Sequence, residues 1–162
     1  MPDIDRTTIA PDLPWPYNGI VRDLAVAVEN GCNYLAALGL ICWSEFIGRQ
    51  IARTRGEPEG SNFDCFKRFV TGYMHYDLGP SAGAVYDAFR DGLVHEFFIK
   101  GRDTAVATEL HTLGPAAHPF PGLAFDPNGG LRVFFVREYF HDFEAGLRRW
   151  LIESGQLRVE RK

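Results

Sequence analysis

The segment between residues 32 and 53 constrains the fold most, because its hydrophobic side chains would cover nearly every side of a helix. A helix of this kind is usually central in a bundle. Its most apolar part, residues 34–47, is interrupted by Gly39, Ser44 and Glu45 and is shorter than the ~20 residues that cross a bilayer. We therefore expect a buried core helix and no membrane contact.

Apolar residues at helical spacing predict further helices on both sides of this segment. One begins near Ile20 and ends at Asn30-Gly31, which is either a C-cap or a kink. Ser61 or Asn62 offers an N-cap for the next helix, which we expect to end at residues 78–80. Two more are predicted at about 81–100 and 138–154, so that the chain has about five helices.

The first 18 residues differ from the rest because they contain several helix-breaking prolines. We expect residues 1–18 to form an extended N-terminal arm, which Trp15 and Tyr17 would attach to the surface. Residues 19–162 are long enough for one domain with a genuine core, and too few for two.

After Gly101 the periodicity changes from helical to two-residue spacing. Short β-branched and apolar runs occur at residues 104–108, 123–125 and 131–136, and the last two flank a turn sequence, Asp126-Pro-Asn-Gly-Gly130. This pattern predicts a β-hairpin insertion at about 104–136. The expected fold is mainly α, with a small antiparallel β-sheet in the C-terminal third.

The composition excludes several classes of protein. The chain has 162 residues, of which 46% are hydrophobic, and a formal net charge of −4, which argues against coating nucleic acid by bulk electrostatics. Three cysteines, Cys32, Cys42 and Cys65, lack metal or redox spacing and are expected to be buried reduced thiols. The N-terminus lacks the pattern of a signal peptide, so we expect a cytoplasmic protein.

The pair most suggestive of chemistry is Arg90 and His95, separated by four residues within the helix predicted at 81–100. Histidine titrates near neutral pH, and arginine presents a planar fork of donors that matches phosphate. Together they suggest phosphate chemistry without a metal. No histidine spacing typical of a metal site occurs, and no cofactor is expected.

This helix also predicts a contact between copies of the chain. At ~100° per residue, Arg90 and His95 lie off the core stripe and flank a second face. If this helix packed against only one neighbouring element, Val94 and Phe98 on that face would remain exposed to solvent. Gly92 has no side chain and would allow the backbone of another segment to approach closely. We therefore expect a homodimer that uses Gly92, Val94 and Phe98.

The string Arg90-Asp-Gly-Leu-Val-His95 resembles the R-x4-6-H motif of the HEPN superfamily, and Asp91 and Phe97 fit the fuller pattern of a polar and an aromatic residue. The resemblance implies a helical bundle that dimerises so that two Arg/His pairs form one cleft. Many members are metal-independent endoribonucleases, often in toxin-antitoxin or defence systems, while others are binding modules. It further implies that His95 acts as the acid/base and that Arg90 stabilises the phosphate. We also name Asp91 and Glu45 as supporting residues of this candidate site.

Two functions remain open from the sequence. In the first, the dimer binds a nucleotide or a partner protein without turnover; in the second, Arg90 and His95 cleave RNA. Acidic residues beside the motif and the lack of a basic groove favour the first, because phosphate contacts supply most of the affinity for RNA.

Glu45 is isolated within the most apolar helix, where an unpaired carboxylate is costly. We therefore expect an arginine or histidine partner. An ion pair that holds two helices together is favoured over a role in orienting Arg90 or His95.

Overall fold

The computed structural model describes residues 9–78, 82–91, 104–107, 123–124, 132–135 and 136–158, and all structural statements below concern these residues. Along the chain, the elements are α1 (Tyr17–Glu29), α2 (Asn33–Arg55), α3 (Asn62–Gly72), α4 (Ala82–Asp91), β1 (Thr104–Ala107), β2 (Leu123–Ala124), β3 (Arg132–Phe135) and α5 (Val136–Glu153). The described part of the chain is therefore mainly helical, as the sequence predicts.

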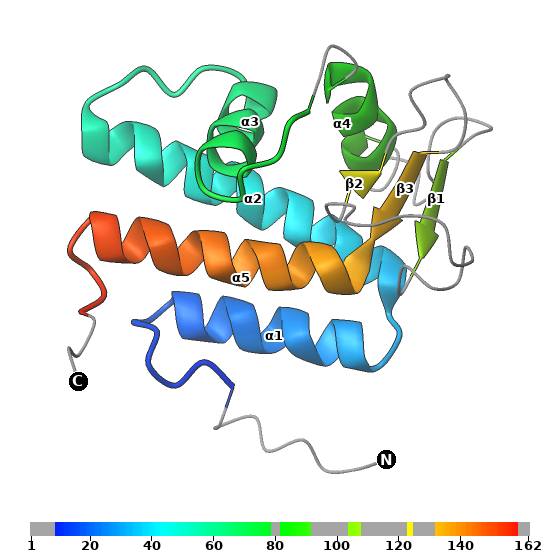
Figure 1. Ribbon diagram of the computed structural model, residues 1–162, viewed down its shortest axis with the longest axis horizontal. Coiled ribbons are helices and arrows are strands. Elements are labelled where there is room, and N and C mark those ends of the chain that lie inside the picture. The colour runs from blue at the N-terminus through cyan, green and yellow to red at the C-terminus, as the bar shows by residue number, and fades with distance from the viewer. Residues whose placement is uncertain (1–8, 79–81, 92–103, 108–122, 125–131, 159–162) are drawn as a thin grey trace.

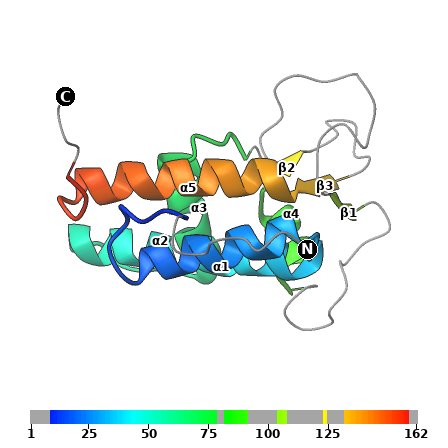
Figure 2. The ribbon, with the colours of Figure 1, turned by 90° about the horizontal axis from the view of Figure 1, so that it is seen from below.

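Helix α2 is central, because α1, α3, α4 and α5 all pack against it. In Figure 1, α1, α2 and α5 run alongside one another and each packs against the other two, while α3 and α4 lie on the other side of α2. The view from below in Figure 2 shows α1, α2 and α5 running side by side, with the sheet at one end. The largest fully buried side chains include Trp150, Phe69 and Leu40, which come from three different helices. The core thus lies between the helices that surround α2.

Helix ends follow local chemistry. Gly31 has a φ of 68° and separates α1 from α2, so that Asn30-Gly31 is a C-cap and not a kink. Ser61 caps α3: its side chain accepts a hydrogen bond from the backbone of Asp64, whose carboxylate accepts one from the backbone of Ser61 in return. Gly56, with a φ of 66°, ends α2.

Helix α3 is shorter than expected, because it ends at Gly72 and not near residue 78. His75 has a φ of 61°, which breaks the helical path. Tyr76 then turns inward and its hydroxyl donates a 2.6 Å hydrogen bond to Asp142 of α5. Burial of Tyr76 and Leu78 against the core thus outweighs continuation of α3.

The N-terminal segment is attached by residues other than Trp15. Ala10, Leu13 and Tyr17 are buried, whereas Trp15 is 84% exposed. Asp12 forms an ion pair with Arg148 of α5. Tyr17 and Asn18 already belong to α1, so the described part of the predicted arm ends at Pro16.

The sheet is mixed: the predicted antiparallel pair of runs at 123–125 and 131–136 is confirmed as β2 and β3, but the prediction of a wholly antiparallel sheet was wrong. Strand β3 lies in the middle and pairs antiparallel with β2 but parallel with β1. The two-residue periodicity identified the strands, but it carries no information about strand direction. Strand β3 leads directly into α5, and this connection places the sheet at the end of the bundle where α2 begins.

Helix α2 is long and apolar enough to span a membrane by length and composition, and it is the one helix of the described ranges with this property. However, 56% of its apolar window is buried inside the protein. Core helices share these properties, and the packing of four helices around α2 agrees with the core position that the sequence predicts.

Candidate functional site: a buried glutamate and a half-buried arginine

The site begins with helix α4, which aromatic contacts orient against α2. Phe89 is buried and meets Phe134 of β3 edge to face, with ring centroids 5.5 Å apart. Tyr86 is also buried, between Phe63 and Phe66 of α3. Because Arg90 is one helical turn after Tyr86, it comes to lie at the edge of the buried face of α4. The expectation that Arg90 would lie away from that face was therefore wrong.

Glu45 of α2 is the partner of both Tyr86 and Arg90. The Tyr86 hydroxyl donates a 2.6 Å hydrogen bond to Glu45 Oε1, and Arg90 Nε donates to the same oxygen at 3.3 Å. The side chains of Glu45 and Arg90 are 11% and 20% exposed. This confirms the prediction that Glu45 has a charged partner, and the ion pair joins α2 to α4.

A second polar contact lies one residue away on α2. The Ser44 hydroxyl donates to the backbone oxygen of Leu40 at 2.7 Å, which leaves its oxygen to accept from the Tyr139 hydroxyl at 2.9 Å. Burial raises the pKa of Tyr139 above its ordinary value. Tyr139 is thus a neutral hydrogen-bond donor at any physiological pH, and its contact joins α2 to α5.

Cys42 lies close to the charged pair on the outer side of α2, and it is exposed, as is Cys32. Only Cys65 is buried, so the expectation of three buried thiols was wrong for two of them. Desolvation and the Glu45 carboxylate raise the pKa of the Cys42 thiol, while the Arg90 guanidinium opposes this rise. Cys42 therefore remains a protonated thiol near neutral pH, and its pKa depends on the charges of both Glu45 and Arg90.

Several predicted site residues fall outside the part of the chain that the structure describes. His95 and the proposed dimer residues, Gly92, Val94 and Phe98, belong to this group. Asp91 is the last residue of α4. The structure thus brings together Glu45 and Arg90 of the predicted set, and it adds Tyr86, which the sequence analysis missed although its spacing of four residues from Arg90 was a usable signal.

A second arginine and histidine, Arg68 and His75, have the same loose spacing as the motif. Arg68 donates hydrogen bonds to the backbone oxygens of Gly48, Pro58 and Glu59. Its guanidinium thereby holds the loop between α2 and α3, while His75 is exposed on a turn. We therefore assign Arg68 a structural role and keep Arg90 as the candidate.

The arrangement provides a positioned cation. A carboxylate that accepts from Nε fixes the plane of the Arg90 guanidinium, and a fixed planar fork suits an anion such as phosphate. Within the described ranges, no three histidine, cysteine, aspartate or glutamate side chains lie close enough together to hold a metal ion.

Comparison with known protein families, curated proteins and solved structures found no match for this chain.

Proposed function

We propose that this protein is a helical interaction module that acts as a homodimer and binds a phosphate-bearing ligand, a nucleotide, at Arg90. The observation that carries the proposal is the hydrogen bond from Arg90 Nε to the buried Glu45 carboxylate, which orients the guanidinium at the edge of the core. An arginine that is held in this way loses less side-chain entropy when it binds a phosphate than an unrestrained surface arginine does.

The resemblance of residues 90–95 to the HEPN motif also supports Arg90 as the residue that binds the phosphate. It extends the proposal to a cytoplasmic protein of a defence or toxin-antitoxin system, with a partner protein as a further ligand. In this proposal His95 lies near the bound phosphate and Asp91 supports it.

Binding is favoured over turnover because the charge balance at Arg90 is close to neutral. Glu45 offsets the charge of Arg90, and Asp87 is exposed one turn earlier on the same helix. A long polyanion such as RNA depends on many phosphate contacts and would be repelled by such a surface. A single nucleotide needs only one or two.

The second candidate function is a metal-independent endoribonuclease, favoured by the same orientation of Arg90. His95 would accept the proton of a ribose 2′-hydroxyl as its oxygen attacks the adjacent phosphorus, and a proton would be delivered to the departing 5′-oxygen. Arg90 would stabilise the charge on the phosphate. The products would be a 2′,3′-cyclic phosphate and a 5′-hydroxyl.

The deciding experiment is a calorimetric titration with ATP, with adenosine and inorganic phosphate as reference ligands. We expect Arg90→Ala to weaken ATP binding at least tenfold, since a charge-assisted bond contributes about 1.5–3 kcal/mol. Arg55→Ala is the matched control, because Arg55 is a more exposed arginine that also pairs with a glutamate, Glu153, at the far end of α2. Equal affinity of the Arg90→Ala variant and the wild type would refute the proposal.

The alternative has its own measurement. Incubation with varied RNAs in EDTA, followed by end-group analysis, detects cyclic phosphate. Loss of this product in both His95→Ala and Arg90→Ala, with circular dichroism showing that both variants remain folded at the assay temperature, would establish the ribonuclease and displace the binding module.

A further inference from the structure

The buried carboxylate of Glu45 accepts hydrogen bonds through one of its two oxygens. Tyr86 and Arg90 both donate to Oε1, at 2.6 and 3.3 Å, and no residue of the described ranges donates a hydrogen bond to Oε2. A carboxylate has two acceptor oxygens, each able to accept more than one hydrogen bond. Oε2 of Glu45 is therefore left for a donor other than Tyr86 and Arg90.

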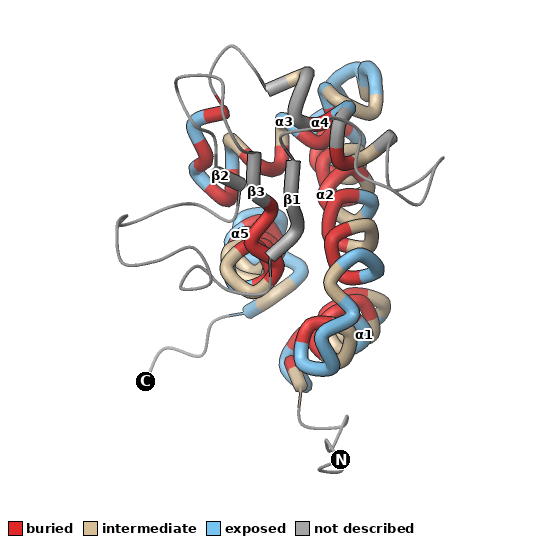
Figure 3. Tube along the Cα trace, turned by 90° about the vertical axis from the view of Figure 1, so that its right-hand side faces the viewer, coloured by how far each residue is buried: buried red, intermediate tan, exposed pale blue. Residues whose placement is uncertain are grey.

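This oxygen lies at the border between the buried and the exposed sides of α2, which Figure 3 shows as a change from red to tan and pale blue. At ~100° per residue, Ile41 and Cys42 lie on opposite sides of Glu45 around the helix axis. Ile41 is buried, whereas Cys42 is exposed. The Glu45 side chain is 11% exposed, and Oε2 shares in this exposure because surrounding atoms do not enclose it. A ligand in solvent can therefore reach it.

The geometry of the pair is not the one that best joins two helices. A carboxylate and a guanidinium pair most strongly through two parallel hydrogen bonds, one for each oxygen. In this site Arg90 Nε instead shares Oε1 with the Tyr86 hydroxyl. Because a buried carboxylate is costly unless it is well hydrogen-bonded, an oxygen kept out of the pair calls for another explanation. Binding of a ligand donor supplies one.

The position of Oε2 limits the chemistry of that donor. Oε1 already accepts from two groups, so the site offers one oxygen and not a pair. The edge of a guanine base presents two neighbouring donors and would need both oxygens of a carboxylate. A hydroxyl donates once and needs one oxygen. The donor must also lie near the anion that Arg90 binds, because both residues belong to the same ion pair.

We infer that Glu45 Oε2 accepts a hydrogen bond from a ribose hydroxyl of the nucleotide at Arg90. The inference rests on the proposed function and names the ligand as a ribonucleotide. The sugar of a nucleotide lies between the phosphate and the base, so its hydroxyls are the donors nearest to the phosphate. An acidic side chain that binds a ribose hydroxyl also occurs in dinucleotide sites of other folds. Tyr86 is then a positioning residue, because its hydrogen bond fixes the Glu45 carboxylate.

This contact would discriminate between sugars. A deoxyribose that lacks the hydroxyl would place a carbon against Oε2 and displace the water that satisfies this oxygen in the free protein. Sites built to bind a hydroxyl reject the analogue without it for this reason. The site should therefore prefer ribose to deoxyribose, whereas an arginine alone would bind the phosphates of both equally.

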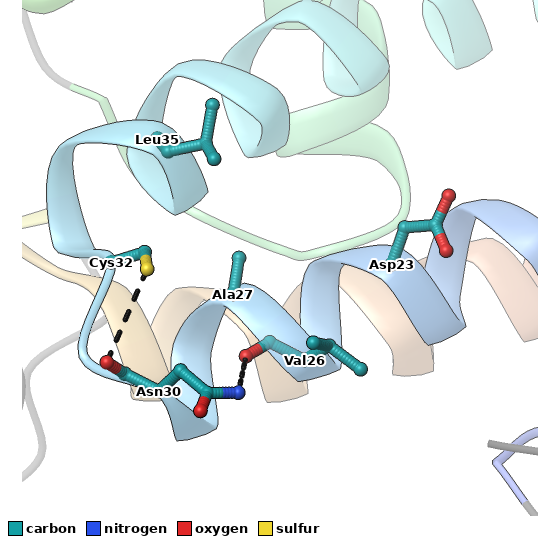
Figure 4. Close-up of a pocket in the computed structure, with 6 residues that line it drawn as sticks. All are labelled: Asp23, Val26, Ala27, Asn30, Cys32 and Leu35. Atoms are coloured by element: carbon teal, nitrogen blue, oxygen red, sulfur yellow. Dashed lines mark hydrogen bonds between the residues drawn. The ribbon is translucent and has the colours of Figure 1, made fainter.

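The surface hollow between α1 and α2 does not offer the same combination of groups. It has a volume of about 360 Å³, and Asp23 is the one charged residue that lines it within the described part of the chain. Figure 4 shows the Asp23 carboxylate at the side of the hollow, beside the apolar side chains of Ala27 and Leu35. A hollow lined by a carboxylate and no cation does not attract a phosphate. Asp23 thus provides a control.

The first test compares ligands on the wild-type protein and needs no variant. ATP, 2′-deoxy-ATP and 3′-deoxy-ATP are titrated calorimetrically at the same salt concentration. We expect one of the two deoxy nucleotides to bind at least about tenfold more weakly than ATP, because a hydrogen bond to a charged group is lost. The weaker of the two identifies the hydroxyl that Glu45 binds.

The second test assigns this preference to Glu45. In Glu45→Gln the two donors, Tyr86 and Arg90, hold the amide oxygen at the position of Oε1, so the amide nitrogen takes the position of Oε2 and cannot accept. We expect the variant to bind ATP and the deoxy nucleotide with equal affinity. Tyr86→Phe is a milder substitution that frees the carboxylate to rotate, and it should reduce the ratio of the two affinities. Circular dichroism verifies that each variant is folded.

Two control variants alter carboxylates elsewhere. Glu153→Gln changes the arginine-paired glutamate at the far end of α2, and Asp23→Asn changes the hollow. Both should keep the wild-type preference for ribose. Loss of the preference in Asp23→Asn would place the nucleotide in the hollow and overturn the inference. So would a preference that persists in folded Glu45→Gln, because Glu45 would then only orient Arg90.

Failure of this inference differs from failure of the proposed function. Equal affinity of the wild type for ATP and both deoxy nucleotides, with binding that Arg90→Ala weakens, would keep the nucleotide site and refute the ribose contact. A preference for ATP over purine riboside triphosphate, without any preference for ribose, would assign Oε2 to the base and refute it as well. Absence of ATP binding to the wild type would refute both proposals.

Discussion

Removal of the Glu45 side chain should destabilise the protein strongly. Glu45→Ala removes the carboxylate that accepts hydrogen bonds from the Arg90 guanidinium, 20% exposed, and from the buried Tyr86 hydroxyl. Breaking a buried ion pair costs about 3–5 kcal/mol. Because Arg90 retains some access to water, we expect the lower end, ~3 kcal/mol. In a chain of 162 residues this corresponds to a drop in melting temperature of roughly 6–12 °C.

The assay is urea unfolding followed by circular dichroism, on a double-mutant cycle of Glu45→Ala and Arg90→Ala. We expect the two substitutions together to cost less than the sum of the two alone, with a coupling energy of about 1–3 kcal/mol. Tyr86→Phe should cost about 1–2 kcal/mol, since Arg90 still occupies the carboxylate.

The control is the exposed ion pair of Arg55 and Glu153, for which the same cycle should give less than about 1 kcal/mol. The reasoning would be refuted if Glu45→Ala cost no more than Glu153→Ala, or if the Glu45/Arg90 coupling were zero. Either result would mean that water, and not Arg90 and Tyr86, satisfies the carboxylate in solution.

Two further predictions concern packing and pH. Gly48→Ala should lower the free energy of unfolding by more than about 3 kcal/mol or prevent folding, because a Cβ at Gly48 would overlap the backbone oxygen of Cys65. The control is Gly72→Ala, which should change the melting temperature little because the space around Gly72 is open. The Arg148 guanidinium holds the pKa of Asp12 below its ordinary value, so the stability from this pair is present above about pH 4 and is lost as the pH falls below it. Asp12→Asn should therefore reduce stability at pH 7 and flatten its dependence between about pH 4 and 2 in denaturant titrations; an unchanged slope would contradict this.

The helical elements could be predicted from the chain because their signals are local. Apolar spacing along α2 and α5 reflects which side chains must leave water, and Ser61 and Gly31 end helices through bonds and φ angles within a few residues. Glu45 is a related case: an isolated carboxylate in an apolar helix demands a partner wherever the chain supplies one. The need for an ion pair at Glu45 could thus be predicted without any tertiary contact.

Tertiary packing decided which groups meet. Strand β1 runs parallel to β3, a direction that the two-residue periodicity of either strand does not encode. Tyr86 turned Arg90 toward Glu45 because Phe63 and Phe66 of α3 hold its ring, and no pattern on α4 alone encodes that contact.

The same distinction applies to the outer side of α2. The sequence by itself determined a helix that is apolar nearly all round, since composition and spacing are properties of the segment. Which side stays uncovered is a property of the assembly, because helix faces are buried only where neighbouring elements reach them. Four helices pack against α2 and still leave Leu35 and Cys42 exposed, and only the tertiary structure defines which part of the helix surface this is.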